Sequence, residues 1–422
     1  MKKILLLSLL ALTIGAQAQF KDNFKNKTLR IDYIHSGSAE AEYYVFDTLY
    51  IEKYWGGSTT KLIDEFDYGN HKFEVYDAAT NELLYSRGFS SLFREYQATP
   101  EGETSCKAFD ETIVLPFPKN AVNIVFYSRL QDMSWRKEFI LPIDPKTRNI
   151  QKNDRKKFKA SKVHYSGKPA EKLDIVIIAE GYTAEEMEKF DQDCQRFKGF
   201  ILESAPYKEN MDKINIWAVK SISEESGTDL PGDDIWKNTV VGTNFYTFGS
   251  ERYLTTEDMI SVRDVAANAP YDQIFILVNH EKYGGGGIYN YYSLGTSDNS
   301  AGDFLFQHEF GHAFAGLGDE YYTSDVAVED FYPLDIEPWE PNITTLSDFD
   351  SKWKNMVSSS TPVPTPAEDK YNTTIGVYEG GGYVAKGVYR PYIDCTMKSV
   401  IYDAFCPVCK RGIQRMIDFY AE

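Results

Sequence analysis

Residues 307–321, which read QHEFGHAFAGLGDEY, constrain this chain more than any other stretch. They contain His308 and His312, and on an α-helix two residues four apart lie on one face, about one turn from each other. Both imidazoles can therefore reach a single metal ion. Glu309 would lie beside that ion, where its carboxylate can accept a proton from an attacking water and pass it to a leaving amine. The spacing thus predicts a hydrolytic metal site on a helix.

Two histidines do not complete such a site, because a catalytic zinc normally has three protein ligands and keeps one position for water. No histidine follows this motif, so the nearest candidates for a third ligand are Asp319 and Glu320. In a continuous helix Asp319 would lie about 16 Å along the axis from His308, at 1.5 Å per residue. The helix must therefore end, and Gly316 and Gly318 allow this because glycine accepts the left-handed conformation that ends helices.

The motif and a later segment together resemble a known family. Residues 308–312, 316–321 and 395–399 are similar to the IgA-peptidase family of metzincin-type bacterial zinc metalloendopeptidases. The glycine and the acidic ligand fall one residue later than in most metzincins, and an acid replaces the usual histidine, which suits the IgA-peptidase branch. The resemblance extends from about residue 170 to 422. It implies Zn²⁺ bound by His308, His312 and Asp319, with Glu320 as the alternative third ligand and Glu309 as general base and acid.

The same resemblance suggests roles for residues around the metal. Met397 would form an apolar floor beneath it, and a strand near the glycine run 284–287 would form the rim of the cleft and pair with extended substrate. The four glycines by themselves favour a mobile loop. A tyrosine could stabilise the oxyanion. The candidates for that role are Tyr389, Tyr392 and Tyr402, and His280 is a reserve candidate for a metal ligand.

The first 18 residues predict a secretory signal peptide. A positive start, an apolar run over residues 4–14 and the Ala16-Gln17-Ala18 pattern are its three parts. The apolar run is too short to span a bilayer, and no later run is long enough to do so. We therefore expect cleavage near Ala18 and secretion to the periplasm or the cell exterior.

Three further segments follow in the predicted organisation. Residues 19–150 contain short β-branched and aromatic runs separated by turns, which predict an antiparallel β-sandwich domain. In it His35 and His71 stand alone, which favours structural roles. Residues 151–172 are rich in lysine and arginine and predict a basic linker.

Residues 173–422 have an α/β pattern. Apolar runs at 173–179, 214–219 and 273–278 predict buried strands. Thr183 to Glu186 form a capping box that opens a helix reaching about Leu202, and a last helix runs from about Cys409 to Tyr420. The predicted fold class is thus α/β (α+β), a metzincin-like zinc peptidase domain preceded by a β-sandwich domain.

The five cysteines permit two interpretations. Cys406 and Cys409 have the spacing of half a zinc knuckle, but no second pair exists to complete four ligands. A disulfide from Cys395 to Cys406 or Cys409 and a set of reduced buried thiols are equally compatible with the sequence.

The net charge of −18 argues against nucleic acid or an anionic membrane as partner. The leading prediction is a secreted zinc-dependent metalloendopeptidase that acts on protein or peptide substrates, with host and glycosylated proteins among the candidates. The first alternative is a zinc-dependent amidase or deacylase acting on cell-wall or glycan-linked amides. The second is a non-catalytic surface binding protein with a structural metal. Neither the substrate nor the oligomeric state follows from the sequence.

Overall fold

The computed structural model describes residues 19–152, 156–322, 332–401 and 404–421. Residues 1–18, for which the sequence predicts a signal peptide, lie outside these ranges. Among the described helices, none is long and apolar enough to cross a membrane.

The N-terminal part is β-rich, as predicted, and consists of two four-stranded sheets with the orders β5-β1-β2-β8 and β4-β3-β6-β7. Apolar side chains from both sheets, among them Ile31 and Val75, lie in one hydrophobic core. The elements are β1 (Phe24–Gly37), β2 (Glu42–Glu52), β3 (His71–Asp77), β4 (Leu83–Phe89), α2 (Leu92–Gln97), α3 (Pro100–Thr104), β5 (Lys107–Pro118), β6 (Val122–Arg129), β7 (Trp135–Ile143) and β8 (Ile150–Gln151).

The C-terminal part is built on a mixed six-stranded sheet with the order β13-β14-β12-β10-β11-β9. Strands β11, β10, β12 and β14 run parallel, and β9 and β13 are antiparallel edge strands. The elements are β9 (Lys159–His164), β10 (Leu173–Glu180), α4 (Met187–Leu202), β11 (Ile214–Lys220), α5 (Met259–Ala266), β12 (Gln273–Val278), β13 (Gly285–Ile288), β14 (Tyr292–Thr296), α6 (Gly302–Ala315), β15 (Tyr378–Gly381), β16 (Val384–Arg390) and α7 (Pro407–Tyr420).

Short 3₁₀ turns connect these elements. They are η1 (Pro169–Glu171), η2 (Ala184–Glu186), η3 (Lys208–Lys213), η4 (Pro231–Asp233), η5 (Thr247–Gly249), η6 (Phe349–Ser351), η7 (Lys354–Met356) and η8 (Asp369–Tyr371).

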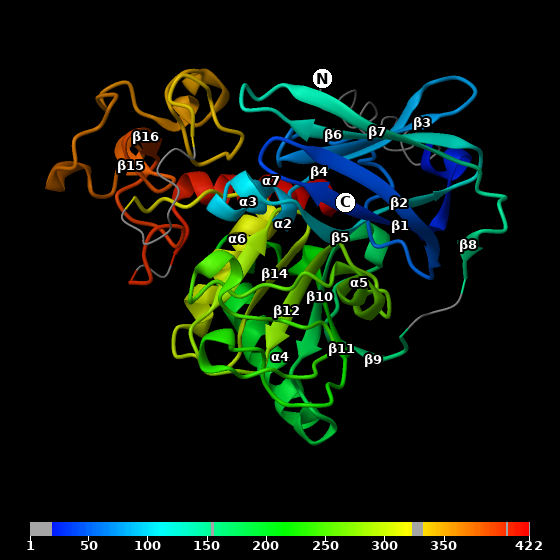
Figure 1. The fold of residues 1–422 in the computed structure, drawn as a ribbon. Helices are drawn as coiled ribbons and strands as arrows, with labels where there is room; N and C mark the ends of the chain where they lie inside the picture. Colours follow the sequence, from blue (N-terminus) through cyan, green and yellow to red (C-terminus); the bar gives the residue numbers. More distant parts are fainter. Residues whose placement is uncertain (1–18, 153–155, 323–331, 402–403, 422) are drawn as a thin grey trace, which may run out of the picture.

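Both faces of the six-stranded sheet are buried, which explains why its central strands are mostly apolar. In β10, Ile175 and Ile177 point into the core formed with α4, α6 and α7. Val176 and Ile178 point the other way, into the core formed with α5. Because successive side chains alternate between the faces of a strand, a strand covered on both faces has no solvent-facing positions, and polar side chains in these strands, such as Asp174, are buried and hydrogen-bonded. Figure 1 shows this α/β part in green and yellow below the N-terminal sheets.

Several predicted elements are confirmed. The three apolar runs form β10, β11 and β12, and the final helix is α7. Thr183 and Glu186 form the predicted capping box ahead of α4.

The segment predicted as a basic linker is different in the structure, because residues 159–164 form the edge strand β9, paired with β11. Its lysines lie on an edge strand, where charge prevents unwanted pairing with other strands. The glycine run also differs from a mobile loop, since residues 285–288 form β13.

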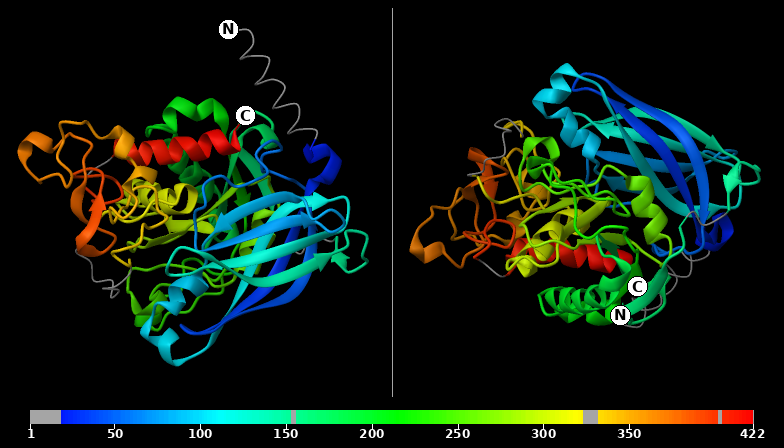
Figure 2. Two further views of the ribbon diagram at one scale, coloured as in Figure 1. Left: turned by 90° about the horizontal axis from the view of Figure 1, so that it is seen from above. Right: turned by 60° about the horizontal axis from the view of Figure 1, so that its bottom comes forward.

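The two parts of the chain share a buried polar interface. The guanidinium of Arg30 in β1 forms a 2.9 Å ion pair with Asp264 in α5. Nearby, Arg263 Nε donates a hydrogen bond of 3.0 Å to Thr112 Oγ1 in β5. Figure 2 shows the blue and cyan sheets packed along one side of the α/β part in both views. The N-terminal part is therefore joined to the site-bearing part by charged groups withdrawn from water.

Candidate active site

The helix that carries the histidine motif ends where the glycines allow it. Helix α6 stops at Ala315, and Gly316 has a φ of 61°, in the left-handed region. The Gly316 amide still bonds to the carbonyl of His312 at 3.0 Å, while the Leu317 amide bonds back to Gly311 at 3.3 Å. This closure turns the chain back toward the helix, as expected for a third ligand beyond it.

Backbone carbonyls orient both histidines. The Nδ1 atom of His308 lies 3.0 Å from the carbonyl oxygen of Thr396, and that of His312 lies 2.5 Å from the carbonyl oxygen of Leu317. Because a carbonyl can only accept, each Nδ1 carries a proton, which leaves Nε2 as the atom that can bind a metal. The two Nε2 atoms lie 3.1 Å apart. The histidines are thus held in the tautomer that binds a metal.

Asp319 completes this group. Its Oδ1 lies 3.1 Å from His308 Nε2 and 3.3 Å from His312 Nε2. In a tetrahedral site with bonds of about 2.0 to 2.1 Å, donor atoms lie about 3.3 to 3.4 Å apart. The other oxygen, Oδ2, accepts a hydrogen bond from the hydroxyl of Tyr383. The three donor atoms therefore already have nearly the separations that a tetrahedral ion requires.

The electrostatics also fit a cation at this position. Burial disfavours a charged imidazole, but the Asp319 carboxylate outweighs it and raises the pKa of His312 to about 9. Burial likewise opposes ionisation of Asp319, yet the two histidines hold its pKa well below the ordinary range. Without a metal, a proton on His312 therefore supplies the positive charge that balances the Asp319 carboxylate. A divalent ion supplies that charge without protonating a ligand.

Backbone hydrogen bonds on both sides of residues 319–321 determine which of the two acidic side chains, Asp319 or Glu320, faces the histidines. On one side, the amides of Gly382 and Tyr383 in the β15–β16 hairpin donate to the carbonyls of Asp319 and Tyr321, at 2.8 and 2.9 Å. On the other side, the Glu320 amide donates to the carbonyl of Met397 at 2.8 Å. A segment held in this way points neighbouring side chains in opposite directions. Asp319 faces the histidines, and Glu320 faces away from them.

The side chain of Glu309 lies beside the three donors and projects from α6 toward β13. A methyl group at Gly285 would come within 2.9 Å of its Cγ, so only glycine leaves room for the side chain there. Burial raises the pKa of Glu309, against the opposing effect of the nearby histidines. A carboxylate with a raised pKa near a water site is suited to accepting and returning a proton.

The loop containing Met397 packs against helix α6 at Gly311. The amides of Lys398 and Ser399 both bond to the carbonyl of Cys395, at 2.8 and 3.0 Å, which forms a tight turn. Met397 is fully buried, and a methyl group at Gly311 would lie 2.9 Å from its sulfur. The methionine therefore packs directly against α6, on the turn of helix between the two histidines.

Two tyrosines that the sequence did not suggest lie against the metal-binding residues. Tyr389 pairs through its backbone with Thr344, and Tyr402 lies outside the described residues. Instead, Tyr383 bonds to Asp319, and the ring of Tyr321 stacks near His308 with centroids 6.4 Å apart. Burial and the nearby Glu309 charge raise the pKa of Tyr283 to about 12.

The reserve ligand candidate His280 does not join the group. Its Nδ1 accepts a hydrogen bond from the Lys282 amide at 3.0 Å, and no group of metal-binding side chains among the described residues includes it.

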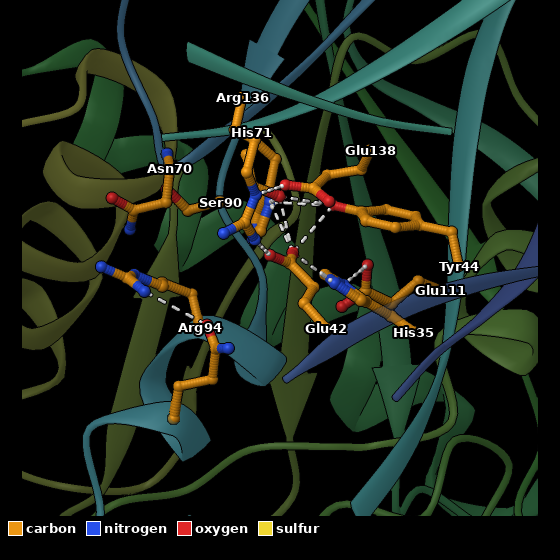
Figure 3. Close-up of polar contacts among 12 residues, drawn as sticks. His35, Glu42, Tyr44, Asn70, His71, Ser90, Arg94, Glu111, Arg136 and Glu138 are labelled. Atoms are coloured by element: carbon orange, nitrogen blue, oxygen red, sulfur yellow. Dashed lines mark hydrogen bonds and ion pairs between the residues drawn. The ribbon is translucent and has the colours of Figure 1, made fainter. Parts of the chain in front are cut away.

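The prediction that His35 and His71 stand alone is wrong. Both lie in a largely buried polar network around Glu42, with Tyr44, Ser128 and Glu111 (Figure 3). Glu42 Oε1 is 2.8 Å from His35 Nε2, and Glu111 Oε2 is 3.0 Å from His35 Nδ1. These residues come from several strands, so only their register brings them together. Nothing in the local sequence indicates the network.

The N-terminal part also reaches the active site. The hydroxyl of Tyr253 donates a hydrogen bond of 2.5 Å to Oε2 of Glu95, which is in α2. Burial raises the pKa of Glu95 to about 7, while the hydrogen bond from Tyr253 and the charge of His312 lower it and the charge of Glu309 raises it further. No local sequence feature indicates this contribution, because α2 is a short helix within a strand-rich region.

Two family models match the chain. The model described as IgA Peptidase M64 matches residues 162–374 and 367–417, and the model described as Peptidase M64 N-terminus matches residues 19–140. Comparison with curated proteins finds no match. The predicted resemblance is therefore confirmed, and the peptidase match covers more than half of the chain, including α6 and the Met397 turn. The chain belongs to the IgA peptidase M64 family and is a peptidase of the metallopeptidase type.

Proposed function

We propose that the protein is a secreted zinc-dependent endopeptidase whose ion is held by His308, His312 and Asp319. The observation that carries the proposal is the convergence of two Nε2 atoms and one carboxylate oxygen, 3.1 to 3.3 Å apart, beside a buried glutamate. Two imidazoles and one carboxylate form a typical catalytic zinc set. When bound, zinc supplies a Lewis acid that activates water and polarises the scissile carbonyl.

Glu309 is the proton carrier in this proposal. Its carboxylate accepts a proton from the attacking water, holds it on one oxygen and donates it to the leaving nitrogen. The raised pKa favours this cycle, because the protonated form is less costly for a buried carboxyl group than for an exposed one. Gly285 and Gly287 let β13 pass close to Glu309 and fix its position.

The finer points of the fold belong to the same proposal. We take the two N-terminal sheets as a β-sandwich because they enclose one core. We take the C-terminal part as metzincin-like, because the glycine-ended helix, the ligand beyond it and the buried methionine turn recur in it together. The sequence of residues 1–18 supports export.

The test is Glu309→Gln, assayed on a mixed peptide library with metal content measured in parallel. The variant should keep its zinc and lose about 10²- to 10⁴-fold in kcat, the usual contribution of a positioned acid or base. Glu188→Gln, an exposed carboxylate on α4, is the matched control and should be fully active. Turnover by the Glu309 variant at the level of this control would remove Glu309 from the mechanism.

The same library separates the amidase alternative. Cleavage of internal peptide bonds supports an endopeptidase, whereas activity confined to cell-wall or glycan-linked amides would support an amidase or deacylase on the same site.

A further inference from the structure

Three of the five cysteines meet behind the active site, together with Glu320. Their sulfur atoms and one carboxylate oxygen all lie within 4.8 Å of one another. All three cysteines are free thiols, and all four side chains are buried. The members of this group, called here the cysteine cluster, are Glu320, Cys395, Cys406 and Cys409.

The start of α7 prepares two of these thiols to bind a cation. Cys406 is the N-cap of the helix, and its sulfur accepts a hydrogen bond from the Cys409 amide at 3.5 Å. The Cys406 amide in turn donates to the sulfur of Cys395 at 3.2 Å. Amide donors and a helix N-terminus both stabilise thiolate, the form in which cysteine binds metals.

Glu320 gives an independent indication of a missing partner. Its Oε1 accepts hydrogen bonds from Asn342 at 3.0 Å and from the Cys409 thiol at 3.1 Å. Its Oε2 is buried and has no hydrogen-bond partner among the described residues. An unsatisfied carboxylate oxygen costs free energy in the interior, and a bound cation would remove that cost.

The donor set determines which cation fits. Three thiolates and one carboxylate suit a tetrahedral ion with soft-ligand affinity, which favours Zn²⁺ over Mg²⁺ or Ca²⁺. Three thiolates and one carboxylate carry the same formal charge as four thiolates. This set is therefore electrostatically equivalent to a four-cysteine zinc site. The carboxylate takes the fourth position that the sequence alone left empty.

We propose that Glu320, Cys395, Cys406 and Cys409 bind a second zinc ion, with a structural role. All four positions are filled by protein side chains, so no position remains for water or substrate. A disulfide explains the group less well, because it would use two sulfurs and leave a thiol and an unsatisfied carboxylate buried together.

The second ion would tie together the parts that shape the first site. Cys395 begins the Met397 turn, whose Thr396 carbonyl orients His308. Glu320 directly follows Asp319, and Cys406 and Cys409 anchor α7. Adjacent acidic residues thus face two metals on opposite sides of one segment. Binding of the second ion would fix the backbone that presents Asp319 to the first.

The test counts zinc in the full mature chain purified under non-chelating conditions. The wild-type protein should hold two ions per chain, His312→Ala one, and Cys409→Ser one. Cys194→Ser removes a buried thiol of α4 outside the cluster and should keep both. A single ion in the wild type that His312→Ala abolishes would overturn the proposal. A single ion that His312→Ala retains and Cys409→Ser abolishes would instead support the second site and contradict the proposed function.

X-ray absorption at the zinc edge of His312→Ala keeps the proposal testable if Cys409→Ser does not fold. This variant should show sulfur scattering near 2.3 Å, the usual zinc–thiolate distance. Its three cluster thiols should resist alkylation until zinc is withdrawn. Nitrogen and oxygen neighbours alone, or a disulfide among the three cysteines found by mass spectrometry, would refute a zinc–thiolate site.

Discussion

The closest packing at the active site is between β13 and α6, and Gly287→Ala tests whether catalysis depends on it. A methyl group at Gly287 would overlap the carbonyl oxygen of Glu309 and lie 2.9 Å from its carbonyl carbon and 3.0 Å from the Cβ of His312. Carbon atoms ordinarily approach to about 3.5 to 4.0 Å. Because the obstacle is the backbone of a packed helix, no side-chain rotation can relieve it.

The helix must therefore move by roughly 0.5 to 1 Å, and a misplacement of about 1 Å can cost about 10²-fold in rate. That loss corresponds to about 2.7 kcal/mol of barrier, at 1.36 kcal/mol for each tenfold change. Overpacking should also lower the stability by about 1 to 3 kcal/mol. The backbone of Gly287 is not in the left-handed region, so the effect is purely steric.

Gly295→Ala in the neighbouring strand is the matched control. Its added methyl group would meet only side-chain atoms, at 3.4 to 3.6 Å, which is ordinary contact. We would measure kcat/KM on a peptide substrate, zinc content and Tm for both variants. Gly287→Ala should lose activity while Gly295→Ala keeps it. Equal activity and Tm in the two variants would refute the argument that this strand sets the position of Glu309.

Three further predictions concern charge and metal binding. Tyr383→Phe removes the hydrogen bond to Asp319 Oδ2 and should weaken zinc binding at the first site by about 10- to 100-fold. Tyr389→Phe on the same hairpin is the control and should not weaken it. Competition with a chelator measures the zinc affinity of both variants. Since His312 has a pKa of about 9 without metal, a proton must leave when zinc binds, so affinity should fall about tenfold from pH 8 to pH 7; an affinity independent of pH would contradict that pKa. In the N-terminal network Glu111 and Glu42 outweigh burial and raise the pKa of His35 to about 9, so its stabilising charge is complete below pH 6.5 and is lost as pH rises through 9. His35→Gln should abolish this loss, on the order of 3 kcal/mol, in urea unfolding at pH 6 and pH 9.5, and an unchanged pH dependence would count against a charged His35.

The parts of this molecule that sequence reasoning could predict are those with local causes. Strands β10, β11 and β12 follow from apolar runs, and the capping box marks the start of the turn η2 that leads into α4. The end of α6 follows from the chemistry of its motif, because a third ligand requires a turn and Gly316 permits one. In each case the signal and the structure span the same few residues.

The rest depends on contacts between distant segments. Gly285 and Gly287 indicate a loop when conformational entropy alone is considered, yet they form a strand by pairing with β14, and they are glycines because α6 leaves no room for side chains. The lysines of β9 indicate a linker, although they sit on a sheet edge. Glu320 could not be assigned to the cysteines, because a hairpin and the Met397 loop together set its direction.

From the contact between Glu95 and Tyr253 we expect the two parts of this enzyme to be inherited together. Two family models divide the chain between residues 140 and 162, but Glu95, on the N-terminal side of that division, bonds to Tyr253 on the other side and is influenced by the charges of His312 and Glu309. A recombination event that moved only the peptidase part into another gene would keep His308, Glu309, His312 and Asp319 but lose Glu95, the hydrogen-bond partner of Tyr253. A peptidase part transferred without the N-terminal part should therefore lose part of the surroundings of its active site.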